Sequence, residues 1–236
     1  MTERGRSRVR RSIHRFEIGP SSVQWEDGRL ILDIDERAVP LGQRVRGRVT
    51  VTPQALCTWT TTLDDGGRHR WGPIAPAARI EVAFSSPDLN WSGPAYLDSN
   101  EGDEPIDRPF VEWDWSRASL RDGSTAVVYD VRQRTGRDRV IAVRFHPDGR
   151  VEPFDAPPRQ ALPRTAWRIG RTMRTDPGHP AEVIETLEDT PFYVRSVLRS
   201  GLLGESVVSM HETLNVPRFA SKAVQLMLPW RMPRTP

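Results

Sequence analysis

Two pairs of side chains have the types and the spacing that suit acid catalysis. His69 and Trp71 are two residues apart in "GRHRWGPIAP", and Tyr96 and Asp98 are two apart in "AYLDSNEGDEP". Alternate side chains of a β-strand share a face, so each pair shares one if its segment is a strand. Aromatic surroundings disfavour the charged form of a carboxyl group and raise its pKa. The pattern therefore makes Asp98 a candidate acid that stays protonated and donates its proton to a weak base.

A third segment, "FVEWDWSRA", favours either a cavity wall or ordinary core packing. Trp113 and Trp115 would share a strand face with Arg117. The residue pattern leaves both interpretations of these tryptophans open. "DSNEGDEP" is also rich in turn-forming residues. We expect its other carboxylates to be solvated or to pair with arginines: Glu101, Asp103 and Glu104.

Several classes of chemistry lack their motifs in this sequence. There is no glycine-rich phosphate loop, no G-x-S-x-G and no H-E-x-x-H. The single cysteine, Cys57, excludes an internal disulfide and a cysteine-based zinc cluster. None of the histidines has the short spacing of a metal site: His14, His69, His146, His179 and His211. We therefore expect no metal and no cofactor.

Turn residues and alternation predict an all-β chain. Asp-Gly or a close relative separates strand-like runs in "VQWEDGRLILDID", "TLDDGGRHRW", "ASLRDGSTAVVYDV" and "VRFHPDGRVEPF", which is typical of β-hairpins. The flanking runs alternate with period 2, as in "RLILDID", and favour antiparallel sheets. The chain as a whole suggests a barrel or sandwich with two sheet systems. "RFASKAVQLMLPW" predicts a short C-terminal helix that ends at Pro229, either closing a barrel or docking on a membrane.

The charge distribution points to two kinds of surface. The net charge is +3, and the first fifteen residues hold an arginine cluster: Arg4, Arg6, Arg8, Arg10, Arg11 and Arg15. Such a cluster contacts anionic lipid or nucleic acid, or forms a solvated strand face, and we favour the solvated face. The chain shows no secretory signal and no apolar stretch of about 18 residues.

Long blocks of the sequence resemble a known family. "GRHRWGPIAPAARIEVAF", "GPAYLDSNEGDEPIDRPFVEWDWSRASL", "LEDTPFYVRSVL" and "MHETLNVPRFASKAVQLMLPWRMPR" resemble bacterial carotenoid 1,2-hydratases, also called hydroxyneurosporene synthases. The resemblance implies two lipocalin-like β-barrels in tandem. We expect the first at 1–92 and the second at 93–236, with the active site at their junction. Relatives carry further upstream sequence, so we expect the first barrel to be incomplete.

The resemblance also implies an activity. The family adds water across the terminal C1–C2 double bond of acyclic carotenoids such as neurosporene and lycopene, without a redox cofactor. The implied partners are an acyclic carotenoid and water, with no nucleic acid. The implied location is cytoplasmic, with peripheral contact to the inner or photosynthetic membrane.

The resemblance implies roles for the residues singled out above. Asp98 would be the general acid, with Trp71 and Tyr96 facing the carbocation. His69 would orient Asp98 or the water, or accept the proton that the water loses. The substrate-binding positions would be Trp113, Trp115 and His211. Glu101 departs from the small or aromatic residue expected at its position. The alternatives are a non-catalytic lipocalin-like protein that binds an isoprenoid, and an isomerase or cyclase acting on another polyene.

Overall fold

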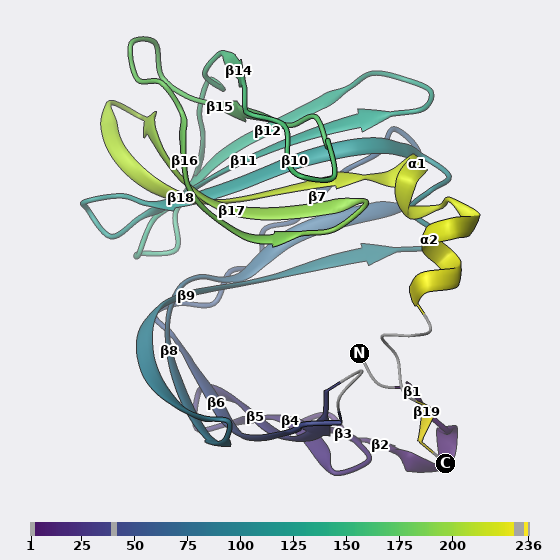
Figure 1. The fold of residues 1–236 in the computed structure, drawn as a ribbon. Coiled ribbons are helices and arrows are strands. Elements are labelled where there is room, and N and C mark those ends of the chain that lie inside the picture. Colours follow the sequence, from purple (N-terminus) through teal and green to yellow (C-terminus); the bar gives the residue numbers. More distant parts are fainter. Residues whose placement is uncertain (1–2, 39–41, 229–233, 236) are drawn as a thin grey trace. The chain divides into compact units, whose positions relative to one another are not determined.

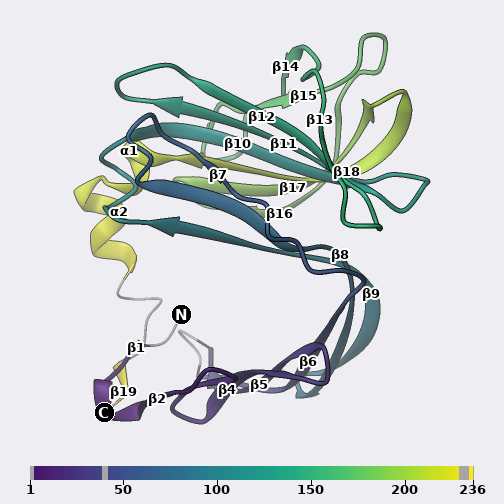
Figure 2. The same cartoon turned by 180° about the vertical axis from the view of Figure 1, so that it is seen from behind.

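The described chain consists mainly of antiparallel β-strands (Figures 1 and 2). The structure, a computed structural model, describes residues 3–38, 42–228 and 234–235. The antiparallel prediction is confirmed, and so are the Asp-Gly turns: at the first of them Asp27 and Gly28 have φ angles of 49° and 72°. Each sheet has an open strand order within the described residues, so closed lipocalin-like barrels stay a prediction.

The chain folds as two compact units, each built from separate segments. Unit 1 comprises Met1–Leu56, Ala75–Leu97 and Gln225–Pro236, and unit 2 comprises Cys57–Ile74 and Asp98–Val224. Two long strands contribute residues to both units: β8 (His69–Ser86) and β9 (Asp88–Gly102). The predicted boundary between residues 92 and 93 lies inside β9, and the division into two lipocalin-like domains there stays a prediction.

Unit 1 is a sheet with one apolar face. Its strands are β2 (Val9–Arg11), β3 (Arg15–Ile18), β4 (Ser21–Glu26), β5 (Arg29–Arg37), β6 (Arg44–Pro53) and the later part of β8, paired in that order. The earlier part of β9, a strand that pairs with β8, also belongs to unit 1. Trp25, Leu30, Val51 and Ile80 form one row across four strands. On the opposite face Arg48 pairs with Asp33 at 2.7 Å. Three short elements accompany these strands: β1 (Glu3–Arg4), η1 (Arg6–Arg8) and β19 (Arg234–Thr235).

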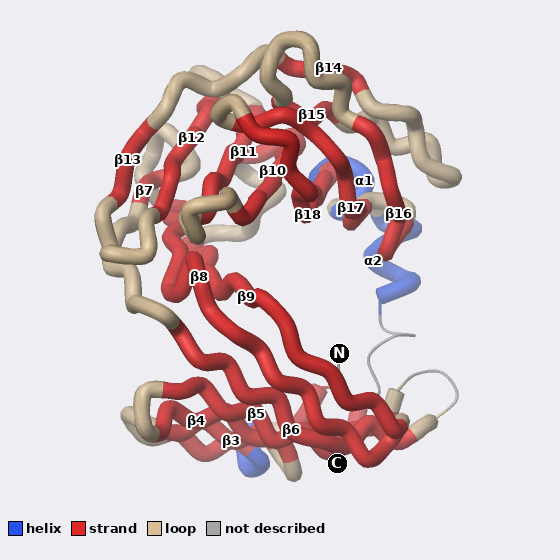
Figure 3. Tube along the Cα trace, turned by 90° about the vertical axis from the view of Figure 1, so that its left-hand side faces the viewer, coloured by secondary structure: helices blue, strands red, loops and turns tan. Residues whose placement is uncertain are grey.

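Unit 2 is built on a seven-stranded sheet. In spatial order its strands are β13 (Val151–Pro153), β12 (Arg139–Phe145), β11 (Thr125–Gln133), β10 (Phe110–Ser119), β18 (Glu205–Asn215), β17 (Tyr193–Leu202) and β16 (Glu182–Asp189). A hairpin of β14 (Arg159–Ala161) and β15 (Thr172–Arg174) lies across this sheet (Figure 3). Short strand β7 (Thr61–Thr62) pairs with the beginning of β8.

The two faces of this sheet meet different parts of unit 2. Thr172 of β15 donates its hydroxyl hydrogen bond to Asp114 at 2.6 Å, so the hairpin covers the Asp114 face. Trp71 of β8 contacts the rings of Tyr129 and Phe145. Tyr129 pairs with Trp115 across the sheet, and Trp115 faces away from its neighbour Asp114. The beginning of β8 therefore packs on the other face, called here the tryptophan face.

The C-terminal helical segment is broken in two. Helix α1 (Val216–Phe219) is followed by α2 (Lys222–Met227). Asn215 caps α1 by accepting a hydrogen bond from the backbone N–H of Arg218 at 3.1 Å. The prediction of a short C-terminal helix is confirmed. The predicted end of this helix at Pro229 lies outside the described residues. Within the described residues, no helix has both the length and the apolar character needed to span a membrane.

Candidate active site

A hydrogen bond joins two of the predicted residues from separate strands. The indole Nε1–H of Trp71 on β8 donates to Oδ2 of Asp98 on β9 at 2.8 Å. Trp71 is 1% exposed, whereas Asp98 is half-buried. A buried, packed ring that holds one carboxyl oxygen fixes the orientation of the whole carboxyl group. Sequence spacing identified both residues, and the structure shows that they contact each other.

Trp71 lies in an aromatic cluster within unit 2. Its ring makes edge-on contacts with Trp59, Tyr129 and Phe145, at centroid distances of 5.8, 5.6 and 6.4 Å. Each such pair contributes about 0.5–1.5 kcal/mol beyond the burial of its surface. Sequence analysis missed these three partners. Alternation along "AVVYDV" could have placed Tyr129 with the core residues Val127 and Val131, but no local pattern marks Trp59.

Tyr129 brings a buried hydroxyl close to the candidate acid. Its side chain is 2% exposed. Burial raises the pKa of the Tyr129 hydroxyl far above its ordinary value, and the negative charges of Asp98 and Glu212 raise it further. Tyr129 therefore keeps its proton at physiological pH.

His69 is buried and tied to two neighbouring segments. Its Nε2–H donates to the backbone oxygen of Glu104 at 2.9 Å, and its backbone N–H donates to Oδ1 of Asp64 at 2.7 Å. The ring packs edge-on against Phe110 at 4.9 Å. Burial alone would raise the pKa of the Asp64 carboxyl group. The hydrogen bonds from the backbone N–H groups of His69 and Arg68 have the larger combined effect, so the pKa lies below its ordinary value. These contacts make His69 a positioning residue beside Trp71, and a direct part in the chemistry stays a prediction.

The three predicted substrate-binding residues do not lie together. Trp115 pairs across the sheet with Tyr129, and Trp113 contacts the Tyr129 ring at 6.3 Å, so both belong to the tryptophan face. His211 pairs with Ser116, which places it on the opposite face. Its Nε2–H donates to the backbone oxygen of Thr172 at 2.8 Å. Substrate contacts of Trp113, Trp115 and His211 stay predictions, and the contacts seen at His211 hold β15 on the sheet.

The remaining predicted residues have mixed outcomes. Tyr96 is half-buried two residues before Asp98 on β9, in the segment that belongs to unit 1, and its role stays a prediction. Glu101 and Asp103 are exposed. Glu104 pairs with Arg68 at 3.0 Å, so the expected arginine pairing of this loop is confirmed there. Among the described residues, no group of three or more His, Cys, Asp or Glu side chains is arranged to hold a metal ion.

These features define an antiparallel β protein with an aromatic cluster around an oriented carboxyl group. The family model described as carotenoid hydratase CrtC matches residues 1–236. The chain belongs to this carotenoid hydratase family.

Curated relatives share the same description. An acyclic carotenoid 1,2-hydratase of Rubrivivax gelatinosus is 65% identical over 234 residues, covering 99% of this chain and 58% of the relative. One of Thiocapsa roseopersicina is 50% identical, with the same coverage of 99% and 58%. One of Rhodobacter capsulatus is 38% identical and is covered over 83% of its length. The chain thus spans little more than half the length of the first two relatives.

Proposed function

We propose that this chain hydrates the terminal C1–C2 double bond of an acyclic carotenoid, with Asp98 as the general acid. The observation that carries the proposal is the hydrogen bond from Trp71 to Asp98 at the aromatic cluster. The substrate class is taken from the relatives, which are named acyclic carotenoid 1,2-hydratases.

The first step is proton transfer from the Asp98 carboxyl group to C2. A new C2–H bond forms, the π bond breaks, and a tertiary cation remains at C1. The carboxyl group becomes negative in this step, and a hydrogen bond to an ionised acceptor is stronger than one to a neutral acceptor. The Trp71 N–H therefore stabilises the transition state more than the starting state, which is what accelerates a reaction.

The second step is capture of the cation by water. Aromatic faces near C1 stabilise the cation by about 0.5–2 kcal/mol each, and the Asp98 carboxylate left by the first step adds an opposite charge. Water forms the C1–O bond and loses one proton, giving a tertiary alcohol. The atoms balance without an oxidant or a reductant.

The test combines isotope tracing with one substitution. Lycopene in detergent micelles is incubated with the wild-type chain or with Asp98→Asn, in heavy-oxygen water and then in deuterium oxide. We expect one labelled oxygen at C1 and one deuterium at C2 in the wild type. Asparagine keeps the shape but supplies no acidic proton, so we expect a loss of at least about 100-fold, as for removal of a general acid.

Three results would contradict the proposal. A folded Asp98→Asn protein with activity within tenfold of wild type would remove Asp98 as the acid. Oxygen drawn from O₂, or a need for NADPH, would indicate a hydroxylase. Retention of lycopene without any product would favour the non-catalytic isoprenoid-binding alternative.

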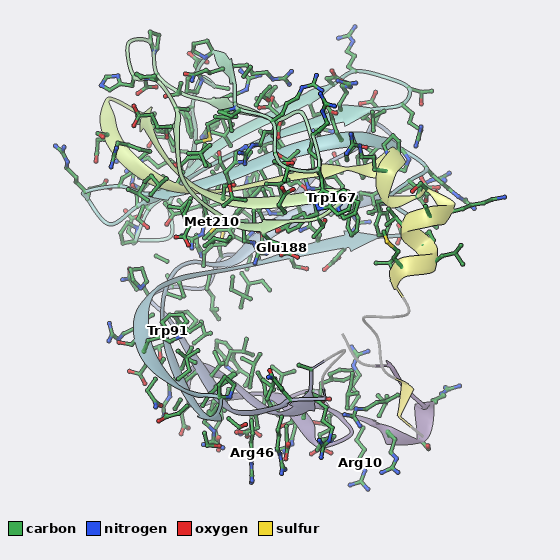
Figure 4. The ribbon with its side chains drawn as sticks, in the orientation of Figure 1. Arg10, Arg46, Trp91, Trp167, Glu188 and Met210 are labelled. Carbon is green, nitrogen blue, oxygen red and sulfur yellow. The ribbon has the colours of Figure 1, made fainter. Side chains whose placement is uncertain are left out.

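The same proposal includes peripheral contact with an anionic lipid surface. In unit 1 the β2–β3 hairpin exposes 91% of Ile13, and the neighbouring Arg10 and Arg11 are also exposed (Arg10 is labelled in Figure 4). Arginines near an anionic surface contribute about 1 kcal/mol each. We expect flotation with phosphatidylglycerol-containing vesicles at low salt, and its loss in the double variant Arg10→Glu, Arg11→Glu. Equal flotation of that variant would rule out this hairpin as the contact.

A further inference from the structure

A second carboxyl group lies on the tryptophan face, against which Trp71 packs. Glu212 of β18 pairs across the sheet with Trp115 of β10, and Trp115 pairs in turn with Tyr129 of β11. Paired residues share a face, so these three side chains form one row. Met210, two residues before Glu212 on β18, has the same orientation and is labelled in Figure 4. Neighbouring strands are about 4.8 Å apart, so Tyr129 and Glu212 are separated by about 10 Å across Trp115.

Glu212 is held in place and remains accessible. Arg195 of β17 donates its Nε–H to Oε1 at 2.9 Å, and the same guanidinium lies 5.7 Å from the centre of the Tyr193 ring. The Glu212 side chain keeps 25% of its surface exposed. The carboxylate is the form of Glu212 that accepts a proton.

Hydration of an alkene needs a proton donor and a proton acceptor in succession. Asp98 loses its proton to C2 before the water adds, and the water then releases a proton of its own. A pair of carboxyl groups held in different environments is the usual way to divide these two tasks. On the tryptophan face, the Tyr129 ring contacts Trp71, which holds Asp98, and Trp115 lies between Tyr129 and Glu212 in the same row.

We propose that Glu212 is the base that accepts the proton released by the attacking water. The water O–H bond breaks as Glu212 gains the proton. Glu212, which is partly exposed, then releases this proton to solvent, and the Asp98 carboxylate takes a proton back from solvent before the next turnover. This inference rests on the proposed function, and it adds a second catalytic residue to the same reaction.

A purely structural role for the ion pair is the competing explanation. The sheet provides a matched control, because Glu182 of β16 pairs with Arg199 of β17 at 3.3 Å. Both pairs join strands of the same sheet, but Glu182 is 60% exposed. Several charged or titratable groups share the Glu212 face of the sheet: Arg117 of β10, Tyr129 of β11, Arg139 of β12, Glu182, Glu185 and Glu188 of β16, and Tyr193, Arg195 and Arg199 of β17. Asp98 of β9 is held beside this face by Trp71.

The first experiment measures the pH dependence of turnover in Glu212→Gln, Glu212→Asp and Glu182→Gln. If Glu212 is the base, protonating it at low pH stops wild-type turnover, and Glu212→Gln loses both this acid limb and about 100-fold or more in kcat. Glu212→Asp restores part of the rate with its acid limb, and Glu182→Gln behaves like wild type. A Glu212→Gln protein within threefold of wild type, with its acid limb intact, would overturn the inference.

The second experiment does not require turnover. Infrared difference spectra between the wild type and Asp98→Asn give the band of the protonated Asp98 carboxyl group. Removing the nearby negative charge makes that carboxyl easier to ionise, so in the Glu212→Gln background the band should disappear at lower pH. An unchanged titration would overturn the coupling of the two carboxyl groups. If wild-type protein turns over no carotenoid but the coupling is present, the proposed function fails while the pairing of Asp98 with Glu212 stands.

Discussion

Trp71 contributes to the site in two separable ways. Its ring fills a buried position and contacts three other rings, and its Nε1–H holds Asp98 at 2.8 Å. Packing acts on the folded protein at all times, whereas the hydrogen bond matters most when Asp98 carries a negative charge. A substitution that removes the N–H and keeps an aromatic ring tests the second contribution.

We expect Trp71→Phe to lower kcat about tenfold. A hydrogen bond to a charged group is worth about 1.5–3 kcal/mol against about 0.5–1.5 kcal/mol for a neutral one. The difference of about 1–2 kcal/mol acts on the barrier. The measurement is kcat for lycopene at a fixed pH, together with the midpoint of thermal unfolding.

The control for this variant is Trp59→Phe. Trp59 contacts the Trp71 and Phe145 rings edge-on, so its substitution disturbs the same cluster and leaves the Trp71–Asp98 hydrogen bond in place. We expect both variants to lose similar stability and only Trp71→Phe to lose kcat strongly. An equal loss of kcat in the two would mean that the cluster matters through packing alone.

Residue spacing predicted part of this site and missed another part. Alternation correctly paired His69 with Trp71, because that relation is local to one strand. Trp71 and Asp98 are 27 positions apart in the sequence and lie on two different strands. Tyr129 lies on a third strand. Such contacts depend on sheet register, which a pattern within one segment does not specify. Sheet register also places His211 on the face opposite Trp113 and Trp115, which no local pattern specifies.

At the scale of elements, a close approach between β8 and β9 positions the site. A Cβ added to Gly102 would lie 2.7 Å from Cδ2 and 3.0 Å from Nε2 of His69. The ring has little freedom to move, because Glu104 and Phe110 hold it. The absence of a side chain at Gly102 therefore lets the end of β9 pass against His69.

We expect Gly102→Ala to destabilise unit 2 by about 1–3 kcal/mol, as overpacking of a buried site does. The control is Gly93→Ala on the same strand, where the added Cβ has its nearest contact, a carbon of Trp91, at 4.0 Å. Urea unfolding followed by tryptophan fluorescence compares the two variants with wild type. A Gly102→Ala protein as stable as Gly93→Ala would show that His69 moves without cost.

Strands and turns were more predictable than the helix. Asp-Gly turns and period-2 alternation are local signals, and the strands around Gly28, Gly123 and Gly149 follow them, each glycine having a positive φ. The expected single helix is divided, because Ala220 and Ser221 separate α1 from α2. Apolar periodicity indicated helical structure there without indicating that it is interrupted.

At the scale of the whole unit, the face opposite Trp115 contains a buried polar network that responds to acid. Burial lowers the pKa of His211 to about 4, from an ordinary value of 6.5. Burial also raises the pKa of Asp114, although Thr172 and Thr213 donate hydrogen bonds to its oxygens. Arg171, Asp130 and Glu212 are the other charged groups that act on His211. The two shifts have opposite consequences for stability.

A histidine whose folded pKa is depressed stabilises the fold while it is neutral. That contribution is complete above pH 6.5 and is lost as the pH falls toward about 4, because the unfolded chain binds the proton first. The pKa difference corresponds to about 3 kcal/mol. Asp114 has the reverse dependence, since a carboxyl group with a raised pKa favours the fold at low pH. Asp114 is present in both the wild type and a His211 variant, so its effect cancels to first order in their comparison.

We therefore expect the free energy of unfolding of unit 2 to fall by about 3 kcal/mol more in wild type than in His211→Gln between pH 6.5 and 4. Glutamine retains an N–H donor for the Thr172 backbone oxygen and does not titrate. Amide hydrogen exchange of β17 and β18 reports this free energy, because their buried residues include Leu198 and Val207. His14→Gln, at an exposed position of unit 1, should match wild type. If wild type and His211→Gln lose stability in parallel over this range, proton binding at His211 is not what weakens the sheet in acid.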